Sequence, residues 1–398
     1  MKPLDGIKVL DLSRVLAGPW CTQLLADLGA DVIKIERPGM GDDTRHWGPP
    51  WLGYGDERVA AYFLSCNRGK KSAAIDFAQA EGAALVRDLA ADADIIVENF
   101  KVGGLKKFGL DAASMRAAHP KLIYASITGF GQDGPYADRA GYDFIIQGMG
   151  GMMSVTGLPD DEPGGGPMRA GVAIVDLFTG MYTCVAILAS LYRRQASGEG
   201  AHIDMALFDT QLAIMANQAS NALVSGKDPP RQGNTHPNIV PYQPFTAADK
   251  PLIVAVGNDR QFARLADICG HPEWASDERF ATNAVRVANR DEVVRIVSEC
   301  IRRKPADEWF EKLEAAGIPA GPINSISQAL ADVQAQHRQM VRTMAGSSVM
   351  GSPVRIDGER ADSDLPPPAL GEHTNDVLAE YLIDALEIER LRSAGVIG

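Results

Sequence analysis

A single acidic residue, Asp176, interrupts the apolar segment "MRAGVAIVDLFTGMYTCVAILASLYRR" at residues 168–194. Carboxylates are seldom buried, because their removal from water is costly unless they are paired. Asp176 is a good N-cap for a helix that starts at Leu177, and that structural role is one explanation for it. The other is chemistry: the helix dipole would hold the carboxylate ionised, with a lowered pKa, as a nucleophilic aspartate requires.

Several other segments carry weaker signals for a ligand site. "RAGYDFIIQGMGGMMSVTG" (139–157) contains five glycines, which let a backbone approach a ligand but also serve plain turns. Arg37 follows a strand-like run and is placed to pair with a phosphate or stack on a base. Two basic clusters have two possible roles: they are solvated surface, or they provide a local positive potential that attracts a polyphosphate. They are "NRGKKS" (67–72) and "KVGGLKKFG" (101–109).

Other kinds of site lack their expected patterns. No HxH, HExxH or acidic cluster indicates a metal site, and no GxSxG elbow indicates a serine nucleophile. "RVLAGP" (14–19) ends the first strand-like run, where open α/β sheets bind ligands, but it is not a GxGxxG fingerprint. A nicotinamide-dependent enzyme is therefore disfavoured.

Hydrophobic patterning predicts a doubly wound α/β sheet in the first two hundred residues. The strand-like runs alternate with helical stretches such as 20–30 and 80–93, as in parallel sheets, and they cover 7–12, 31–36, 71–77, 94–99 and 121–130. The loop-like segment 226–245 marks a domain boundary. A smaller α/β segment follows, with a strand at 252–258 and helices at 259–269, 290–303 and 306–316, before a tail with a strand-like "PVRI" and a final helix.

Composition limits the class of protein and its partners. The net charge of −12 disfavours nucleic-acid binding, so an anionic ligand would need a local positive pocket. The five cysteines are widely spaced, which suits a reducing compartment. No signal peptide begins the chain, and Asp176 breaks up the longest apolar stretch, so we expect a cytoplasmic protein with no membrane span.

Taken together, the motifs resemble those of class III CoA-transferases, the group of formyl-CoA and carnitine CoA-transferases that also contains α-methylacyl-CoA racemases. The segments that carry the resemblance, in order, are "KVLDLSRVLAGPWCTQLLADLGADVIKIERPGMGDDTR", "VENF", "RAGYD", "GVAIVDLFTGMY" and "SGEGAHIDMALFD". The likeness extends from the start of the chain to its last helix. It is strongest to members that exchange CoA between succinate and glutarate or hydroxymethylglutarate. These resemble the chain in the "MKPL" start, "RVLAGP" and "RAGYD", and, with single positions left open, in "ERPGMGDDTRHWGPP", "IVPYQPF" and "AGIPAGPIN".

The resemblance implies a fold and an assembly. The family has a Rossmann-like large domain built from both chain ends and a smaller α/β domain from the middle, in an interlocked homodimer. Here that implies a large domain from 1–225 and 326–398, and a small domain at 226–325.

The resemblance also implies roles for individual residues. Asp176 matches the family nucleophile. The positions implied in CoA binding are Leu16, Ala17, Arg37, Ile75, Phe77, Asn99, Phe100, Lys107, Arg139, Tyr142 and Asp143. A dicarboxylate substrate has a second carboxylate to bind, and for it we expect contacts from Arg45, Trp47 and His236.

The expected activity is transfer of CoA from succinyl-CoA to glutarate or a similar short dicarboxylate, through a covalent aspartyl intermediate. CoA is a co-substrate, and neither a metal nor a redox cofactor is expected. "HPNIVPYQPF" (236–245) lacks the glycine run of formyl-CoA transferases, which argues against oxalate, and its first part, to Gln243, is a candidate lid. Racemases have a histidine where this chain has Tyr142, so racemisation is disfavoured but stays an alternative, as does a catalytically silent CoA-binding protein.

Overall fold

The computed structural model describes residues 2–55 and 58–398. These residues divide into two structural units. The first consists of residues up to 152, 170–220 and 333–398, and the second of 153–169 and 221–332.

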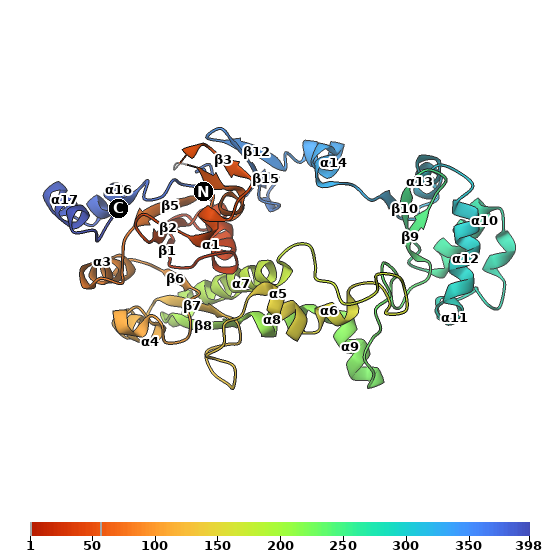
Figure 1. Cartoon of the computed structure of the whole chain (residues 1–398), viewed down its shortest axis with the longest axis horizontal. Helices are drawn as coiled ribbons and strands as arrows, with labels where there is room; N and C mark the ends of the chain where they lie inside the picture. Colours follow the sequence, from red (N-terminus) through yellow and green to blue (C-terminus); the bar gives the residue numbers. More distant parts are fainter. Residues whose placement is uncertain (1, 56–57) are drawn as a thin grey trace. The chain divides into compact units, whose positions relative to one another are not determined.

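A parallel sheet forms the centre of the first unit, as the alternation of apolar runs predicts. Among the described residues its strand order is β5-β2-β1-β6-β7-β8, with every neighbouring pair parallel. The strands are β1 (Lys8–Asp11), β2 (Asp31–Glu36), β5 (Lys70–Ala74), β6 (Ile95–Glu98), β7 (Ile123–Thr128) and β8 (Ala201–Ala206). Because they are parallel, their carboxyl ends lie along one edge of the sheet (Figure 1).

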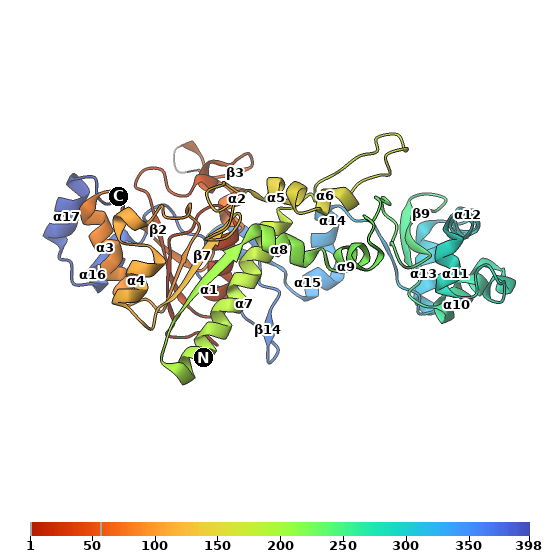
Figure 2. The ribbon, with the colours of Figure 1, turned by 90° about the horizontal axis from the view of Figure 1, so that it is seen from below.

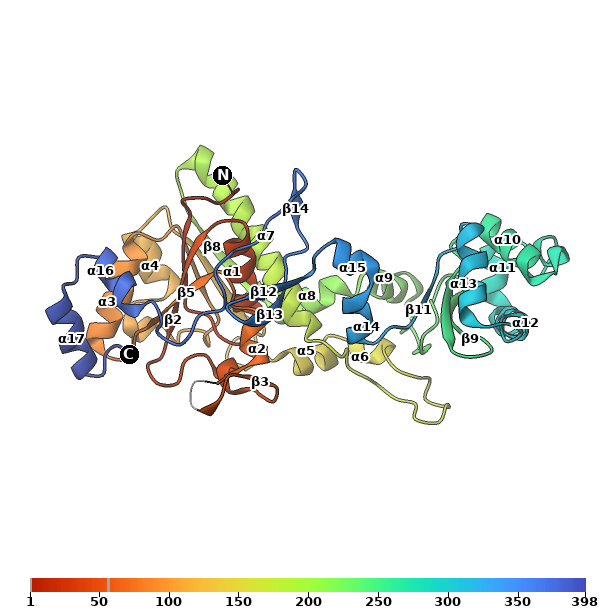
Figure 3. The same cartoon turned by 90° about the horizontal axis from the view of Figure 1, so that it is seen from above.

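Helices cover both faces of this sheet. On one face, α1 (Ala17–Asp27) and α7 (Ile174–Ser197) pack with strand residues into one apolar core. On the other, α3 (Ala80–Ala91) and α4 (Ala112–Ala118) pack with the C-terminal helices α16 (Thr374–Glu380) and α17 (Ala385–Ser393), which lie beside α3 in Figures 1 and 3. The chain's last helices thus complete a core that its first strands begin.

The long helix α7 corrects one expectation from the sequence. Contrary to the expected absence of a membrane-length segment, Ile174–Ser197 is long and apolar enough to span a membrane by length and composition alone. Val175, Ile187 and Leu191 on this helix are buried in the sheet core, and core helices of soluble proteins pass the same test. The helix is therefore weak evidence for a membrane span.

Shorter elements complete the first unit. They are the 3₁₀ turns at Asp43–His46 and Lys106–Phe108, the strands β3 (Trp51–Leu52), β4 (Val59–Ala60), β12 (Val341–Met344), β13 (Ser347–Met350), β14 (Arg355–Ile356) and β15 (Glu359–Arg360), and the helices α2 (Ala61–Leu64), α5 (Asp143–Met149), α8 (Leu207–Ile214) and α15 (Val333–His337). Helices α6 (Met152–Val155) and α9 (Ala216–Ser225) contain two of the four points where the chain passes between the units; the other two follow residues 169 and 332.

The second unit has its own antiparallel sheet and apolar core. The sheet order is β11-β10-β9, and its strands are β9 (Tyr242–Thr246), β10 (Pro251–Ala255) and β11 (Ala320–Pro322). The helices are α10 (Asp259–Cys269), α11 (Asn283–Ala288), α12 (Arg290–Ile301), α13 (Ala306–Ala315) and α14 (Ile326–Ala331), with a 3₁₀ turn at Pro272–Ala275. The strand and the three helices expected here are confirmed, whereas β9 begins inside the segment that the sequence marks as loop.

Candidate functional site

The N-terminus of α7 differs from the sequence-based expectation. The helix begins at Ile174, its N-cap residue is Ala173, and Asp176 lies in the first turn rather than at the cap. The prediction of an Asp176 N-cap is therefore wrong. The side chain that satisfies the first N–H groups of α7 comes from elsewhere in the chain.

That side chain is Asp143, the first residue of α5. Its Oδ1 accepts hydrogen bonds from the backbone N–H groups of Val175 (2.8 Å) and Asp176 (3.3 Å), and its Oδ2 accepts one from Gln147 Nε2 (2.6 Å). Gln147 Oε1 in turn accepts the N–H of Ala170 (2.8 Å). Asp143 and Gln147 thus fix both the start of α7 and the segment leading into it.

Asp143 also affects how Asp176 titrates. Burial raises the pKa of Asp176 to about 7, and the negative charge of Asp143 acts in the same direction. The expectation that the helix dipole would lower this pKa is therefore wrong, because desolvation and a like charge outweigh it. Near neutral pH, Asp176 is a carboxyl group close to its titration midpoint, as is typical of catalytic acids, bases and nucleophiles.

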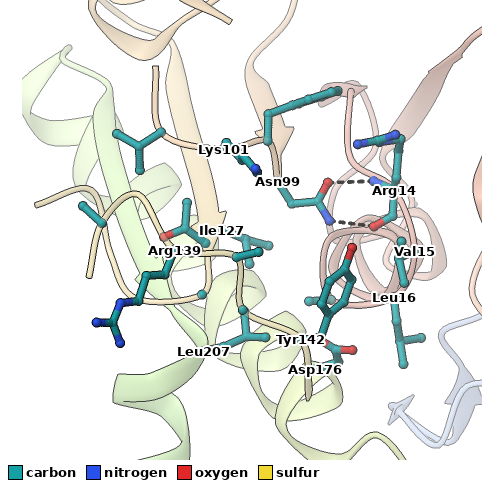
Figure 4. Close-up of a pocket in the computed structure, with 18 of the residues that line it drawn as sticks. Arg14, Val15, Leu16, Asn99, Lys101, Ile127, Arg139, Tyr142, Asp176 and Leu207 are labelled. Atoms are coloured by element: carbon teal, nitrogen blue, oxygen red, sulfur yellow. Dashed lines mark hydrogen bonds between the residues drawn. The ribbon is translucent and has the colours of Figure 1, made fainter. Parts of the chain in front are cut away.

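Asp176 opens onto a pocket of about 210 Å³ at the carboxyl edge of the parallel sheet. The pocket is lined by the loop that joins β1 to α1, by the segment after β6, by the end of β7 and by the loop before α5. The expected site residues among its lining are Leu16, Ala17, Asn99, Phe100, Arg139, Tyr142 and Asp176. The exposed Tyr142 ring lies on the same side of the pocket as Asp176, whereas the guanidinium of Arg139 points away from it (Figure 4).

Two close backbone approaches shape this pocket. A Cβ at Gly129 would lie 2.6 Å from Gly141 Cα, so these glycines let the loop before α5 pack on the end of β7. A Cβ at Gly180, one turn beyond Asp176, would lie 2.6 Å from the carbonyl oxygen of Ala17. The start of α1 therefore rests directly on α7 next to Asp176.

A second pocket, of about 360 Å³, adjoins the first along the same edge of the sheet. Arg14, Asp43 and Phe100 line both pockets, so the two share one wall. The second pocket holds three more of the expected residues, Arg37, Ile75 and Phe77. We refer to the two adjoining pockets together as the trough.

Two expected CoA-binding residues line neither pocket. Asp143 is used in capping α7, as described above. Lys107 is exposed, and its Nζ lies 4.7 Å from the centre of the Phe108 ring, which packs edge-on against Phe77 of the second pocket. Lys107 is thus next to an aromatic wall of the trough.

The residues expected to bind a second carboxylate have different surroundings and belong to different structural units. Arg45 is buried, donates to both carboxylate oxygens of Glu36 (2.8 and 2.6 Å) and lies over the Phe63 ring, so its guanidinium is already occupied. Trp47 is exposed and packs edge-on against Tyr62. His236 belongs to the second unit, where its Nδ1 accepts the N–H of Asn238, and burial lowers its pKa.

The basic cluster at 67–72 does not supply a positive surface. Arg68 pairs with Asp27, and Lys70 pairs with Asp11 (3.0 Å), in both cases beneath the surface. These cations neutralise buried carboxylates. The exposed cations that line the trough are Arg14, Lys101 and Arg139 in the first pocket and Arg14 and Arg37 in the second, whereas Lys34 is buried and paired with Asp42.

Sequence reasoning missed Arg14, Val15, Asp43 and Lys101 as lining residues. Arg14 and Val15 lie within "RVLAGP", so the position of this motif after the first strand could have identified them. Across the described ranges 2–55 and 58–398, no group of three or more His, Cys, Asp or Glu side chains is placed to hold a metal ion. The site as it stands offers a poised carboxyl group, a helix N-terminus and a partly positive trough.

The chain is similar to known proteins over nearly its whole length. The model of CoA-transferase family III matches residues 4–374. The chain is 52% identical over 385 residues to succinate–glutarate CoA-transferase of Agrobacterium fabrum, with 95% of each chain covered. It is 42% identical over 403 residues to succinyl-CoA:glutarate CoA-transferase of Homo sapiens, covering 100% of this chain and 90% of that protein. The crystal structure of a CAIB/BAIF family protein from Brucella suis matches with a TM-score of 0.84 and 51% identity, covering 95% of this chain and 99% of that one.

Proposed function

The chain belongs to CoA-transferase family III, and from that premise we propose that this CoA-transferase moves CoA from succinyl-CoA to glutarate or a similar short dicarboxylate. The single observation that carries the proposal is the partly buried carboxyl group of Asp176 beside the N-terminus of α1, in a pocket at the carboxyl edge of the sheet. The similarity to two proteins named for succinate and glutarate favours these acids as the pair.

The reaction would proceed by double displacement at Asp176. The carboxylate attacks the thioester carbonyl of succinyl-CoA, the carbon–sulfur bond breaks, and a mixed aspartyl–succinyl anhydride and CoA thiolate result. The thiolate then attacks the aspartyl carbonyl, which releases succinate and leaves an aspartyl-CoA thioester. Glutarate attacks that thioester, and the same two steps in reverse give glutaryl-CoA and free Asp176.

The start of α1 is suited to stabilise the oxyanions of these steps. The first N–H groups of a helix have no partner within it, and donors fixed in place stabilise developing negative charge. Leu16 is the N-cap residue of α1 and Ala17 its first residue, and both line the Asp176 pocket. We assign their N–H groups to the oxyanion.

We place the two ends of CoA in the two pockets. The nucleotide end fits the second pocket, where Arg37 can pair with a phosphate and the ring of Phe77 can contact an adenine. The thioester end then lies in the first pocket beside Asp176, passing Asn99 and Phe100. Lys107, Arg139 and Tyr142 remain proposed CoA contacts, whereas Asp143 acts through α7.

The second carboxylate of the acceptor needs a partner of its own. Since Arg45 is occupied by Glu36, we retain Trp47 and His236 as the proposed contacts. We also propose that residues 236–243 act as a lid that keeps water from the anhydride and thioester. Replacing His236 with Ala should then raise acyl-CoA hydrolysis or weaken acceptor binding, and unchanged values of both would remove His236 from the site.

Mass spectrometry of CoA thioesters tests the activity. The protein is mixed with succinyl-CoA and one acid at a time, from glutarate, hydroxymethylglutarate, malate, itaconate, mesaconate, oxalate and carnitine, beside the variant Asp176→Asn. We expect glutaryl-CoA with the native chain and not with the variant. No new thioester with any acid would contradict the proposal.

A second assay separates transfer from racemisation. A racemase needs acid–base groups on both sides of the α-carbon, and none of the described residues lining the Asp176 pocket is a histidine. We therefore expect no exchange of the α-proton of 2-methylacyl-CoA in deuterium oxide. Exchange without thioester transfer would favour the racemase instead.

We further propose that the functional form is a homodimer with interlocked chains and a Rossmann-like large domain. Helix α7 lies at the near surface of the ribbon in Figure 2. One of its faces presents apolar side chains to solvent in the isolated chain: Phe178, Met181, Tyr182, Val185 and Tyr192. Their helical spacing makes a continuous stripe that a second copy would cover. A molar mass of one chain, measured by light scattering at micromolar concentration, would contradict the dimer.

A further inference from the structure

The loop between β1 and α1 contains a strained residue at the site. Val15 has a φ of +71°, in the left-handed region that β-branched residues rarely adopt. Such a conformation persists only where the surroundings hold it, and such residues cluster at functional sites. Val15 lines the Asp176 pocket and directly precedes the two residues at the start of α1.

The carboxylate of Asp42 is the first of two groups that hold this residue in place. Both of its oxygens lie 3.2 Å from the backbone nitrogen of Val15, which donates to them. Asp42 is 1% exposed and also accepts hydrogen bonds from the N–H (3.0 Å) and hydroxyl (2.8 Å) of Thr44. Hydrogen bonds from Thr44 therefore fix the orientation of the Asp42 carboxylate that binds the loop.

The second group that holds the loop is Lys34, which is fully buried on β2. Its Nζ lies 2.9 Å from Asp42 Oδ2 and donates to the carbonyl oxygen of Ser13 at 2.7 Å. The ion pair thus holds the loop at two points, one on each side of Arg14. Asn99 holds the backbone of Arg14 itself, at its N–H (2.8 Å) and carbonyl oxygen (2.6 Å), as the dashed lines in Figure 4 show.

We propose that Asp42 is a positioning residue for the transfer reaction: paired with Lys34, it holds Val15 in the left-handed conformation and so directs the first N–H groups of α1 toward the substrate of Asp176. The inference rests on the proposed function, because it names what aligns the oxyanion donors for that reaction. Asp42 itself need not touch the substrate. Rotation at Val15 would turn Leu16 and Ala17 together, since they follow it in the chain.

The test compares Asp42→Asn in two backgrounds, the native chain and the variant Val15→Gly. Asparagine keeps the size of the side chain but removes the charge that binds Lys34. Glycine adopts a positive φ without steric cost, so at position 15 the conformation depends less on the hydrogen bonds to Asp42. The control is Asp27→Asn, which alters another buried acid–base pair, with Arg68, at the far end of α1.

Three quantities are measured: kcat and KM for transfer from succinyl-CoA to glutarate, the Kd of CoA by calorimetry, and hydrogen exchange of the peptide with residues 12–18. We expect Asp42→Asn to lower kcat about tenfold or more and to change KM and Kd less than about threefold, as for a loss confined to the transition state. In the Val15→Gly background the same substitution should cost at least about threefold less. Exchange of this peptide should be faster in Asp42→Asn than in the native chain or in Asp27→Asn.

Two results would overturn the inference. One is an equal loss of kcat from Asp42→Asn in the native chain and in the Val15→Gly background. The other is a loss of kcat in Asp27→Asn as large as that in Asp42→Asn, which would reflect general destabilisation. If the native chain transfers no CoA, the proposed function fails, and the exchange measurement still decides whether Asp42 holds the loop.

Discussion

Replacing Asp176 with asparagine should make the protein more stable while abolishing transfer. The partly buried carboxyl group has a pKa of about 7 against an ordinary value of 3.8, so ionising it in the folded chain is costly. The pKa of Asp176 is higher in the folded chain than in the unfolded chain. The cost is therefore absent at low pH, grows as the pH rises above the pKa of the unfolded chain, and levels off above the pKa of the folded chain. Asparagine resembles the protonated acid and has no such cost.

The magnitude follows from the two pKa values. With about 1.36 kcal/mol for each pH unit between them, the ionised side chain costs about 4 kcal/mol at pH 8 and about 1.5 kcal/mol at pH 5. The stabilisation by Asp176→Asn should therefore be larger at pH 8 by about 2.5 kcal/mol, a difference in Tm shift on the order of 5 °C for a unit of this size.

Thermal melts of both proteins at pH 5 and pH 8 make the measurement. The control is Asp42→Asn, the same change at a carboxylate whose pKa the Lys34 charge holds low despite its burial, and this variant should lower Tm at pH 8. A Tm for Asp176→Asn at or below that of the native chain at pH 8 would refute the reasoning.

Three other predictions concern the same region. The kcat/KM for succinyl-CoA should rise with pH to a plateau above about pH 8, with its midpoint near 7, because only ionised Asp176 attacks; a rate that falls through this range would exclude a carboxylate nucleophile. Asp143→Asn removes the like charge beside Asp176 and should move that midpoint to lower pH, and an unchanged or higher midpoint in the pH–rate profile would contradict the coupling. Gly180→Ala should lower the free energy of unfolding by about 1–3 kcal/mol in urea titrations, because the new methyl meets the carbonyl of Ala17; Gly171→Ala, with no heavy atom within 4 Å of its added Cβ, is the control, and an equal effect of the two would dismiss the close contact.

The parallel sheet was predictable because its central strands are buried on both faces. Such strands have largely apolar sequences, and "IKVLDL" and "DIIVEN" fall on β1 and β6. Three helices of the second unit, α10, α12 and α13, were predictable for a related reason, since their apolar residues recur at helical spacing, whereas α11 was not predicted. The spacing of apolar residues predicts which side chains of one segment are buried, and in these segments that prediction needs no knowledge of the rest of the chain.

The parts that could not be predicted depend on partners distant in the chain. Asp176 has the residue type and position of an N-cap, yet Asp143, 32 residues before Val175, supplies the cap. Arg45 and Lys70 look like surface cations until the fold places Glu36 and Asp11 against them. Nothing in the letters around Val15 indicates a left-handed residue, because a carboxylate 27 positions away holds it there.

The pKa of Asp176 shows how a local rule can give the wrong sign. A helix N-terminus favours a charged carboxylate by about 0.3–1 kcal/mol at exposed sites. Desolvation acts in the opposite direction and is larger here, and it can be evaluated only once the neighbouring loops are in place. The candidate nucleophile was therefore identified from its motif, whereas its ionisation required the structure.

The most direct test of the central claim is the intact mass of the protein quenched shortly after mixing with succinyl-CoA alone. We predict a species heavier by one CoA less one water, mapped by peptide fragmentation to Asp176, that disappears when glutarate is added and never forms with Asp176→Asn. A chain that transfers CoA to glutarate with no adduct at Asp176, or with an adduct at another residue, would contradict the claim.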